Sequence, residues 1–306
     1  MSGTRGEPAN VGLVPVVVVT DSSARLPAAV ADSYDIIQVP LHLTLDGVDY
    51  LEDDDNVPAD IVSTPGVTTA GATPHDLVQA YGEAIERSEG DGVVAVHMSR
   101  KLSGTWSAGR LAAEDYSGQV RVVDSRSVGL AVGFVAIAAA QAARDGADRD
   151  RAYEAAIRQA ATVESLLCVQ NLDNLRNSGR ISAASKMLGS ALSIKPILHV
   201  VDGTLTLRER TRTFSKALDK MADAAVDYAD GRAVTLGVQH CQAPAAAADL
   251  VVRLRENLRS VTSSITVDLG PVLGCHVGPG AVGVVIGTQL DPITRGQSEA
   301  EGLSTP

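Results

Sequence analysis

The sequence predicts an α/β protein made of two α/β domains with largely parallel sheets. The chain has 306 residues, a length that favours two domains. Short runs rich in Val and Ile alternate with longer segments of helical spacing, and this alternation is typical of parallel sheets covered by helices. Hydrophobic residues make up 45% of the chain but aromatic residues only 3%, so aliphatic side chains must fill the cores.

Composition and polarity divide the chain into four parts. Residues 1–15 lack the basic and then apolar order of a signal peptide, and we expect them to form a disordered leader. Residues 16–163 are predicted to form an N-terminal α/β domain, and residues 164–290 a C-terminal one. Residues 291–306 are polar, and we expect a flexible tail there.

The first predicted domain contains four short apolar strands, one hairpin and five helices. Continuous β-branched runs indicate strands buried on both faces, and Asp46-Gly47 between two apolar runs indicates a hairpin. A threonine cap before Pro74 marks the start of a helix, and small hydroxyl residues just before it predict a turn. The expected strands are Val16–Val19, Ile36–Val39, Val93–Met98 and Val120–Val123, with the hairpin Leu41–Leu45 and Val48–Leu51, the turn Val67–Thr73, and helices Leu26–Ser33, Pro74–Ser88, Trp106–Tyr116, Val128–Ala143 and Arg149–Val163.

The second predicted domain follows the same alternation. Asp202-Gly203 indicates a second hairpin, and apolar residues at helical spacing after Thr211 indicate a helix. The expected strands are Leu166–Val169, Ile194–Val201, Thr204–Arg208, Ala233–Gln239, Ile265–Leu269 and Val282–Gly287, with helices Ile181–Leu192, Thr211–Ala229 and Ala243–Leu258 and a glycine-rich loop Gly274–Gly280.

Charge and cysteine usage exclude several classes of function. The formal net charge of −11 argues against a nucleic-acid partner and leaves at most transient contact with anionic membranes. The most apolar segment, Val128–Ala143, is shorter than the roughly 20 residues that span a bilayer. Cys168, Cys241 and Cys275 are far apart and show no metal-ligand spacing, so we expect no metal site, no disulfide framework and a cytoplasmic location.

Polar residues follow several predicted strands. Asp21 and Ser22, Ser99, and Asp124 and Ser125 each come directly after an apolar run. Ligands of parallel sheets bind at the carboxyl ends of the strands, so these residues are expected at one rim. The seam between the two predicted domains is a second natural place for a ligand.

The segment VVAVHMSRKLSGTWSA, residues 93–108, joins a strand to a helix through small hydroxyl residues. Ser103, Gly104 and Thr105 stand where backbone N–H groups at a helix start can bind a carboxylate or phosphate. The alternative is ordinary capping of that helix by Ser103.

Four further residues have two interpretations each. Thr68 and Thr69 can donate to a ligand or satisfy their own turn. His276 can bind an acidic head group or be a structural histidine. Arg180 can hold a carboxylate or pin its own turn by bonding carbonyls. His97 and His240 lie on predicted strands and are expected to be packing residues.

The loop around His276 matches a dinucleotide motif in form only. Residues 278–283 read GPGAVG, but they lead into a strand instead of a helix, so we reject the dinucleotide interpretation. Gly278 and Gly280 are expected to allow unusual backbone angles or a close approach of backbone to a ligand.

No complete catalytic constellation appears in the sequence. Ser103 has Lys101 two residues before it, where a nucleophile elbow has glycine. A Ser–His–Asp set can be assembled from Ser99 or Ser103, His276 and Asp124 only by free choice among residues.

The order of motifs over residues 16–288 resembles the DegV family, whose members are also described as the fatty-acid-binding subunits of bacterial fatty acid kinase. The resemblance rests on VTDSSARLP, VPLHLTLDG, VTTAGATP, HMSRKLSGTWSA, VVDSRSVGLAVG, LRNSGRIS, IKPILHVVDG and LGCHVGPGAVG. It implies two α/β domains with a fatty acid between them. It also implies that a separate, ATP-dependent kinase forms an acyl phosphate from the presented carboxylate.

The resemblance assigns head-group contacts to named residues. The family hydroxyls correspond to Thr68 or Thr69 and to Ser99, the histidine to His276, and the glycine-flanked arginine to Arg180. The segment TTAGAT departs from the usual Thr-Ser-Gln-Pro pattern, which leaves open which threonine faces the ligand. Arg100 and Lys101 stand where small or varied residues are common, so this rim is expected to carry more positive charge.

Two classes of function follow, a fatty-acid carrier that acts with a kinase and a stand-alone serine-dependent lipid hydrolase. The missing nucleophile elbow and ATP-binding motif favour the carrier, which needs a fatty acid as ligand but no cofactor. Burial of roughly 16 carbons contributes on the order of 10 kcal/mol before ordering costs.

Overall fold

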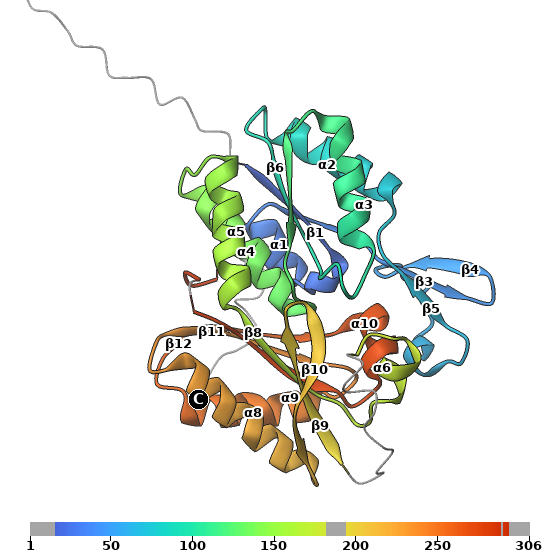
Figure 1. Ribbon diagram of the computed structural model, residues 1–306, viewed down its shortest axis with the longest axis vertical. Helices are drawn as coiled ribbons and strands as arrows, with labels where there is room; N and C mark the ends of the chain where they lie inside the picture. Colours follow the sequence, from blue (N-terminus) through green and yellow to red (C-terminus); the bar gives the residue numbers. More distant parts are fainter. Residues whose placement is uncertain (1–15, 182–193, 289, 294–306) are drawn as a thin grey trace, which may run out of the picture.

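The computed structural model describes residues 16–181, 194–288 and 290–293. The predicted leader 1–15, most of the predicted tail and nearly all of the predicted helix Ile181–Leu192 therefore lie outside the described residues. The described chain has an α/β fold, as predicted, with a four-stranded, a six-stranded and a small three-stranded sheet (Figure 1).

The four-stranded sheet is parallel throughout and comes from the N-terminal half of the chain. Its order is β2-β1-β6-β7, with β1 at Val17–Asp21, β2 at Ile36–Val39, β6 at Val93–His97 and β7 at Val120–Asp124. The two central strands are fully buried, which agrees with their continuous β-branched runs. The prediction of parallel strands is confirmed for this sheet.

Helices cover this sheet on both faces. They are α1 (Ala28–Ser33), α2 (Pro74–Arg87), α3 (Thr105–Ala112), α4 (Leu130–Arg144) and α5 (Arg149–Thr162), with short 3₁₀ turns η1 (Ser22–Ala24) and η3 (Ala113–Tyr116). The predicted threonine cap is confirmed, because Thr73 and Asp76 form a capping box at the start of α2.

Helix α4 is the element that both large sheets share. It contacts β1 and β6 of the four-stranded sheet and β11 and β13 of the six-stranded one. Burial on nearly every side explains why its sequence is apolar all round. α4 has 15 residues, and no helix in the described ranges is both long enough and apolar enough to cross a membrane.

The three-stranded sheet projects from the N-terminal half (Figure 1). Its order is β4-β3-β5, with β3 at His42–Leu45, β4 at Val48–Leu51 and β5 at Thr68–Ala70, and η2 (Ile61–Ser63) precedes β5. The Asp46-Gly47 hairpin is confirmed, with φ of 51° and 79° at its two turn residues. The turn expected at Val67–Thr73 is wrong, because its threonines pair with β3 as a third strand.

The six-stranded sheet of the C-terminal half has the order β10-β9-β8-β13-β11-β12. Its strands are β8 (Glu164–Cys168), β9 (Lys195–Val201), β10 (Thr204–Thr211), β11 (Val234–His240), β12 (Val261–Asp268) and β13 (Val282–Gly287). Only β11 and β12 are parallel, so the largely parallel sheet expected in this half is wrong. The cause is the chain path: β8, β9 and β10 form a meander, and the last strand enters antiparallel between β8 and β11.

In the described residues, four helices accompany this sheet: α6 (Asp173–Asn177), α8 (Phe214–Ala229), α9 (Pro244–Asn257) and α10 (Gly270–Val277). Helix α10 corrects the predicted loop Gly274–Gly280, since His276 lies in the last turn of a helix. Pro271 is compatible with the first helical turn, and Gly278, with φ of 77°, ends the helix by donating its N–H to the Gly274 carbonyl at 2.8 Å.

One hydrophobic core runs through both halves. It contains aliphatic residues of the parallel sheet such as Val18 and residues of the C-terminal half such as Leu167 and Leu273. A second core lies between the six-stranded sheet and helices α8 and α9. The division of the chain into two domains at residue 163 stays a prediction.

Candidate functional site

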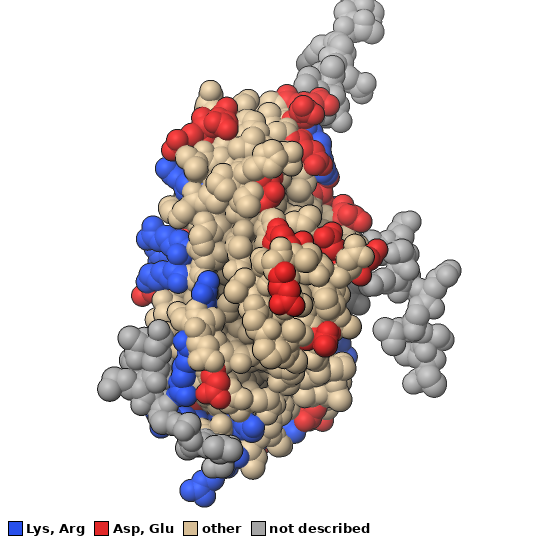
Figure 2. Space-filling view, turned by 90° about the vertical axis from the view of Figure 1, so that its right-hand side faces the viewer, with Lys and Arg blue, Asp and Glu red and all other residues tan. Residues whose placement is uncertain are grey.

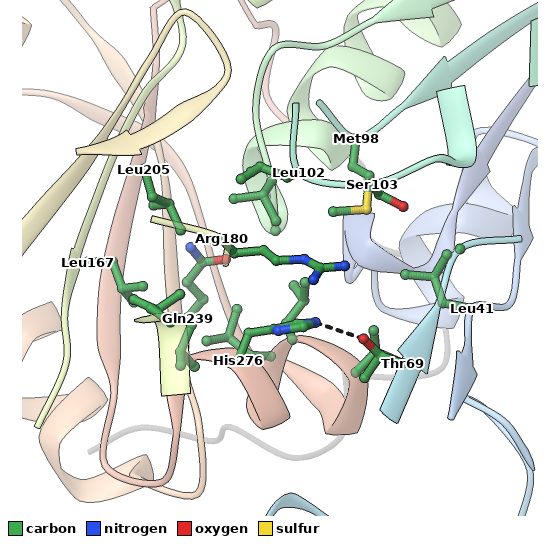
Figure 3. A pocket seen from close by; sticks show the side chains of 18 of the residues that line it. Leu41, Thr69, Met98, Leu102, Ser103, Leu167, Arg180, Leu205, Gln239 and His276 are labelled. Atoms are coloured by element: carbon green, nitrogen blue, oxygen red, sulfur yellow. Dashed lines mark hydrogen bonds between the residues drawn. The ribbon is translucent and has the colours of Figure 1, made fainter. Parts of the chain in front are cut away.

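A cavity lies between the two halves, enclosed by β5, the start of α3, α10 and one face of the six-stranded sheet (Figure 3). It encloses about 780 Å³ of space free of protein atoms, part of which is open to solvent. Most of its wall is aliphatic, formed by Leu41, Met98, Leu102, Val128, Leu167, Leu175, Leu205, Leu269, Val272, Leu273 and Val277. A mostly apolar wall with a few polar groups is typical of small-molecule sites.

Thr69 and His276 form a polar pair in the wall of this cavity. The hydroxyl Oγ1 of Thr69 lies 2.8 Å from Nε2 of His276, which joins β5 to α10 (Figure 3). Side chains alternate along a strand, and of the two adjacent threonines only Thr69 is in the wall of this cavity. Thr68 instead lines an adjoining hollow on the surface.

The imidazole of His276 is neutral at pH 7. Burial lowers the pKa of His276 to about 4, and the positive charge of Arg180 adds to the effect. Its other nitrogen, Nδ1, is buried and makes no hydrogen bond in the part of the chain that the structure describes. A neutral ring carries one N–H, so His276 and Thr69 can together offer at least one donor to a ligand.

Arg180 projects its guanidinium into the same cavity. It follows Gly179, whose φ is 73°, and its Nη1 donates to the Ser178 carbonyl. Within the described ranges it forms no ion pair with any carboxylate. The turn-pinning bond is therefore present, while the charge stays uncompensated and points towards Thr69 (Figure 3). An unpaired charge in such surroundings is a strong attractor for an anion.

The start of α3 contributes Ser103 to the cavity wall. Its Oγ accepts from the N–H of Thr105 at 3.3 Å and lies 2.9 Å from Oγ1 of that residue, while Gly104 is the residue before the helix. Gly71, after β5, passes close by: a Cβ there would lie 2.4 Å from Thr105 Oγ1 and 2.9 Å from Ser103 Oγ. Glycine is therefore required for β5 to approach the helix start.

Ser99 is not brought together with Thr69 and His276. It is buried outside the cavity wall, and its Oγ donates to the carbonyl of Gly203 at 2.7 Å. Gly203 lies in the turn between β9 and β10, so Ser99 connects the two halves. The structure thus gives this hydroxyl a protein partner.

Gly278 and Gly280 also lie outside the cavity wall and position α10. Gly278 ends the helix beside Asn174, and Gly280, with φ of 82°, donates its N–H to the Cys241 carbonyl at 2.8 Å. The three cysteines are free.

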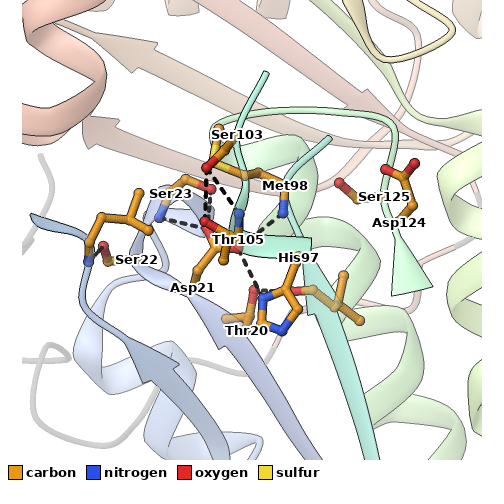
Figure 4. A network of polar contacts seen from close by, with 12 residues as sticks. Thr20, Asp21, Ser22, Ser23, His97, Met98, Ser103, Thr105, Asp124 and Ser125 are labelled. Atoms are coloured by element: carbon orange, nitrogen blue, oxygen red, sulfur yellow. Dashed lines mark hydrogen bonds and ion pairs between the residues drawn. The ribbon is translucent and has the colours of Figure 1, made fainter. Parts of the chain in front are cut away.

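Asp21, another residue of the predicted rim, belongs to a buried polar network beside the cavity (Figure 4). Asp21 accepts from Nδ1 of His97 at 3.1 Å and from the N–H of Met98 at 3.0 Å. Nε2 of His97 lies 2.7 Å from the hydroxyl of Tyr81, and burial raises the pKa of Tyr81. His97 is thus a buried strand residue, as predicted, and Asp21 holds the ends of β1 and β6 together.

Charge at the start of α3 is partly compensated. Arg100 lies 3.3 Å from Asp124, another predicted rim residue, and 5.4 Å from the ring centre of Trp106. Lys101 beside it is exposed. Figure 2 shows Lys and Arg side chains gathered along one edge of the molecule, with Asp and Glu spread over the rest of that face.

Gln239 is a lining residue that the sequence interpretation missed. The sequence does contain one indication of this role, because a polar glutamine ends a predicted strand that is otherwise apolar. Gly71 and Met98 were missed as well, since neither residue type points to a ligand by itself.

Comparison with known proteins agrees with this geometry. A family model described as "Uncharacterised protein, DegV family" matches residues 15–289. The chain belongs to the DegV family. A DegV domain-containing protein of Mycobacterium tuberculosis is 46% identical over 277 residues, which cover 90% of this chain and 99% of the relative. The resemblance inferred from the motif order is confirmed.

Solved structures of DegV proteins share the fold. A DegV family protein from Corynebacterium glutamicum is 36% identical, with a TM-score of 0.80 over 91% of this chain and 99% of the other. A DegV family protein from Thermus thermophilus, described for its fatty acid binding, is 28% identical, with a TM-score of 0.84 over 90% and 99%. The α/β architecture of this chain is therefore that of the DegV family.

Proposed function

We propose that this DegV protein holds one long-chain fatty acid in the cavity between its halves and presents the carboxylate to a separate ATP-dependent kinase subunit. The observation that carries the proposal is an apolar cavity whose wall includes the guanidinium of Arg180, which faces the Thr69–His276 pair and forms no ion pair with any residue that the structure describes. The fatty acid binding described for the Thermus thermophilus relative supports the same ligand class.

The aliphatic wall supplies the affinity for the acyl chain. Each buried methylene contributes about 0.8 kcal/mol, so a chain of roughly 16 carbons gains on the order of 10 kcal/mol before ordering costs. This driving force does not depend on the head group, and it keeps the lipid bound while the carboxylate reacts.

The polar side of the cavity supplies hydrogen bonds to the carboxylate. In this proposal the guanidinium of Arg180 carries the compensating charge, and the Thr69–His276 pair and Ser103 donate the remaining hydrogen bonds. A carboxylate withdrawn from water needs such partners, because its desolvation is otherwise unfavourable.

The carboxylate end is the end that a partner can reach. Thr69, Arg180 and His276 line both the apolar cavity and an adjoining hollow on the protein surface. A kinase bound over this hollow can bring ATP to the carboxylate, whose oxygen then attacks the γ-phosphorus while ADP leaves. The products are an acyl phosphate and ADP, and the cytoplasm is the proposed compartment because it supplies ATP.

A serine hydrolase has no comparable support. In the described ranges neither Ser99 nor Ser103 forms a hydrogen bond with a histidine, and Ser99 donates to a main-chain carbonyl. Serine nucleophiles require an adjacent base to become reactive.

Native mass spectrometry of the protein purified from cells tests the proposal. We expect one fatty acid per chain, uptake of added palmitate or oleate by delipidated protein, and acyl phosphate when a cognate kinase and ATP are added. Absence of bound lipid together with failure to take up either acid would overturn the proposal. Ester turnover that disappears in Ser103→Ala would favour the hydrolase instead.

A further inference from the structure

The largely apolar cavity contains one buried amide, the side chain of Gln239 on β11. Only 3% of Gln239 is exposed, and it is part of the cavity wall. Its Oε1 accepts a hydrogen bond of 3.0 Å from the N–H of Leu130, the first residue of α4. The amide oxygen therefore has a fixed partner at a helix start.

This bond determines which way the amide faces. With the amide reversed, its NH₂ group would point at the N–H of Leu130, and two donors cannot bond each other. Gly129 makes room for the arrangement: its φ is 70°, and a Cβ there would lie 2.4 Å from Oε1 of Gln239. Gly129 and the amide of Gln239 are therefore closely packed against each other.

The NH₂ group of Gln239 is left without a partner. It makes no hydrogen bond to any residue that the structure describes. The residue as a whole is almost fully buried, and its NH₂ group is accessible from the cavity, so an acceptor that enters the cavity can reach it. Figure 3 shows the amide beside Leu167 and Leu205, on the side of the cavity opposite Thr69. A donor that faces a largely apolar cavity is unfavourable when an apolar ligand fills the cavity, unless that ligand accepts a hydrogen bond from it.

The neighbouring strands fix the position of the Gln239 side chain in the cavity wall. Leu167, Gly283 and Gln239 stand in one row across β8, β13 and β11. A Cβ on Gly283 would lie 2.7 Å from the Leu166 carbonyl oxygen, 3.2 Å from Leu167 Cδ1 and 3.3 Å from Gln239 Cγ, so glycine lets these two side chains pack closely over the centre of the row. Ser165, two residues before Leu167, lies on the same face and adds a second polar group to the wall.

We propose that the NH₂ group of Gln239 recognises an oxygen on the acyl chain, so that the preferred ligand is a fatty acid with a hydroxyl or oxo group partway along it. The inference rests on the proposed function. With the carboxylate held near Thr69, the chain extends towards β11 before it meets Gln239, which places the oxygen along the chain and away from its head. A site with a buried donor disfavours a ligand that lacks the acceptor, because the donor is then left unpaired.

Competition binding to the full-length protein tests this assignment. Displacement of a fluorescent fatty acid gives dissociation constants for stearate and for 2-, 10- and 12-hydroxystearate in the wild type and in Gln239→Met. We expect the preference of the wild type for at least one mid-chain hydroxy acid over stearate to fall roughly tenfold in Gln239→Met. The 2-hydroxy acid should show no such change, because its hydroxyl lies beside the carboxylate.

Gln38→Met is the matched control. Its amide bonds both the N–H and the carbonyl of Leu26, at 3.1 and 3.0 Å, and it does not line the cavity. For each protein we compare the ratio of the dissociation constants for stearate and for the hydroxy acid. A general loss of stability changes both constants and cancels in the ratio. In the wild type alone, 10-oxostearate, which can only accept, must bind more tightly than stearate; this measurement needs no variant.

The outcomes separate the two proposals. Suppose that stearate binds but the ratio of its dissociation constant to that of each mid-chain hydroxy acid stays, in Gln239→Met, within twofold of the wild type. The amide then does not recognise an oxygen on the acyl chain, and this inference is wrong. Equal binding of 10-oxostearate and stearate by the wild type overturns it as well. If no fatty acid binds at all, the proposed function fails, and this inference fails with it.

Discussion

Replacing Arg180 by methionine separates the two roles that its guanidinium can have. In the structure Nη1 bonds the Ser178 carbonyl, while the charge faces the cavity with no carboxylate partner among the described residues. Methionine keeps an unbranched apolar stem of similar length but removes the charge and every donor. If the guanidinium holds the ligand, Arg180→Met must weaken acid binding much more than it weakens folding.

The expected magnitude follows from the chemistry of the contact. A hydrogen bond to a charged group contributes about 1.5–3 kcal/mol, which corresponds to roughly 10- to 150-fold in the dissociation constant. Loss of the Ser178 bond is expected to lower the free energy of unfolding by about 1 kcal/mol. Removal of an unpaired, partly buried charge acts in the opposite direction, so the empty protein should change little in stability.

The assay compares oleate with its methyl ester in wild type and Arg180→Met. The ester keeps the chain but carries no negative charge, so only the acid should lose roughly 10- to 150-fold in affinity. Arg232→Met is the control. Its guanidinium bonds the carbonyls of Ala229 and Tyr228 at the end of α8, as Arg180 bonds Ser178, but far from the cavity wall.

Two results would refute the reasoning about Arg180. The first is oleate affinity within twofold of the wild type in a folded Arg180→Met protein. The second is an equal loss of affinity for oleate and its ester, accompanied by a fall in thermal stability. The second result would assign Arg180 to the turn alone.

Three further predictions concern the residues around the cavity. Thr69→Val should weaken oleate binding by roughly five- to tenfold in the displacement assay, because it removes a hydroxyl bonded to His276, whereas Thr68→Val should not. Since burial holds the pKa of His276 near 4, below its ordinary 6.5, the unfolded chain binds this proton first, and stability is lost as the pH falls from 6.5 to 4. Denaturant unfolding should show the wild type losing about 3 kcal/mol more than His276→Asn between pH 7 and pH 4. Ser99→Ala should lower the free energy of unfolding by about 1–3 kcal/mol, because the Gly203 carbonyl loses its partner, while oleate affinity changes by less than about threefold.

Each of these has a clear contrary outcome. Equal effects of Thr68→Val and Thr69→Val would mean that the alternation along β5 does not select the ligand contact. Parallel pH profiles of the wild type and His276→Asn would show that this imidazole titrates normally. A tenfold loss of oleate affinity in Ser99→Ala at unchanged stability would return Ser99 to the head group.

Local patterns in the sequence predicted most of the fold. Continuous β-branched runs located β1 and β6, and the two Asp-Gly pairs located both hairpins, because these signals act within a few residues. Strand direction in the C-terminal half was not predictable in this way. It depends on where β13 enters the sheet, between β8 and β11, and that is decided by packing over a long separation in the chain.

The residues of the candidate site were likewise predictable from local motifs, whereas contacts between segments far apart in the chain were not. Residue type and motif order pointed to Arg180, His276 and either Thr68 or Thr69. The structure places Arg180, His276 and Thr69 at one cavity. Ser99 has the same chemical type as Ser103, and only the position of the β9–β10 turn distinguishes them, because Gly203 accepts from the Ser99 hydroxyl. A single sequence contains no signal for that contact.

Helix α10 joins these observations. At its start the N–H of Val272 donates to the buried carboxylate of Glu52 at 3.2 Å, and in its last turn His276 contacts Thr69. Both partners come from the segment around the three-stranded sheet, so the N-terminal half determines where the imidazole lies. Because that imidazole is neutral, Arg180 is the one unpaired positive charge in the cavity wall described by the structure. A bound carboxylate would compensate this charge, so the empty site is the less favourable state and ligand binding should stabilise the contact between the halves.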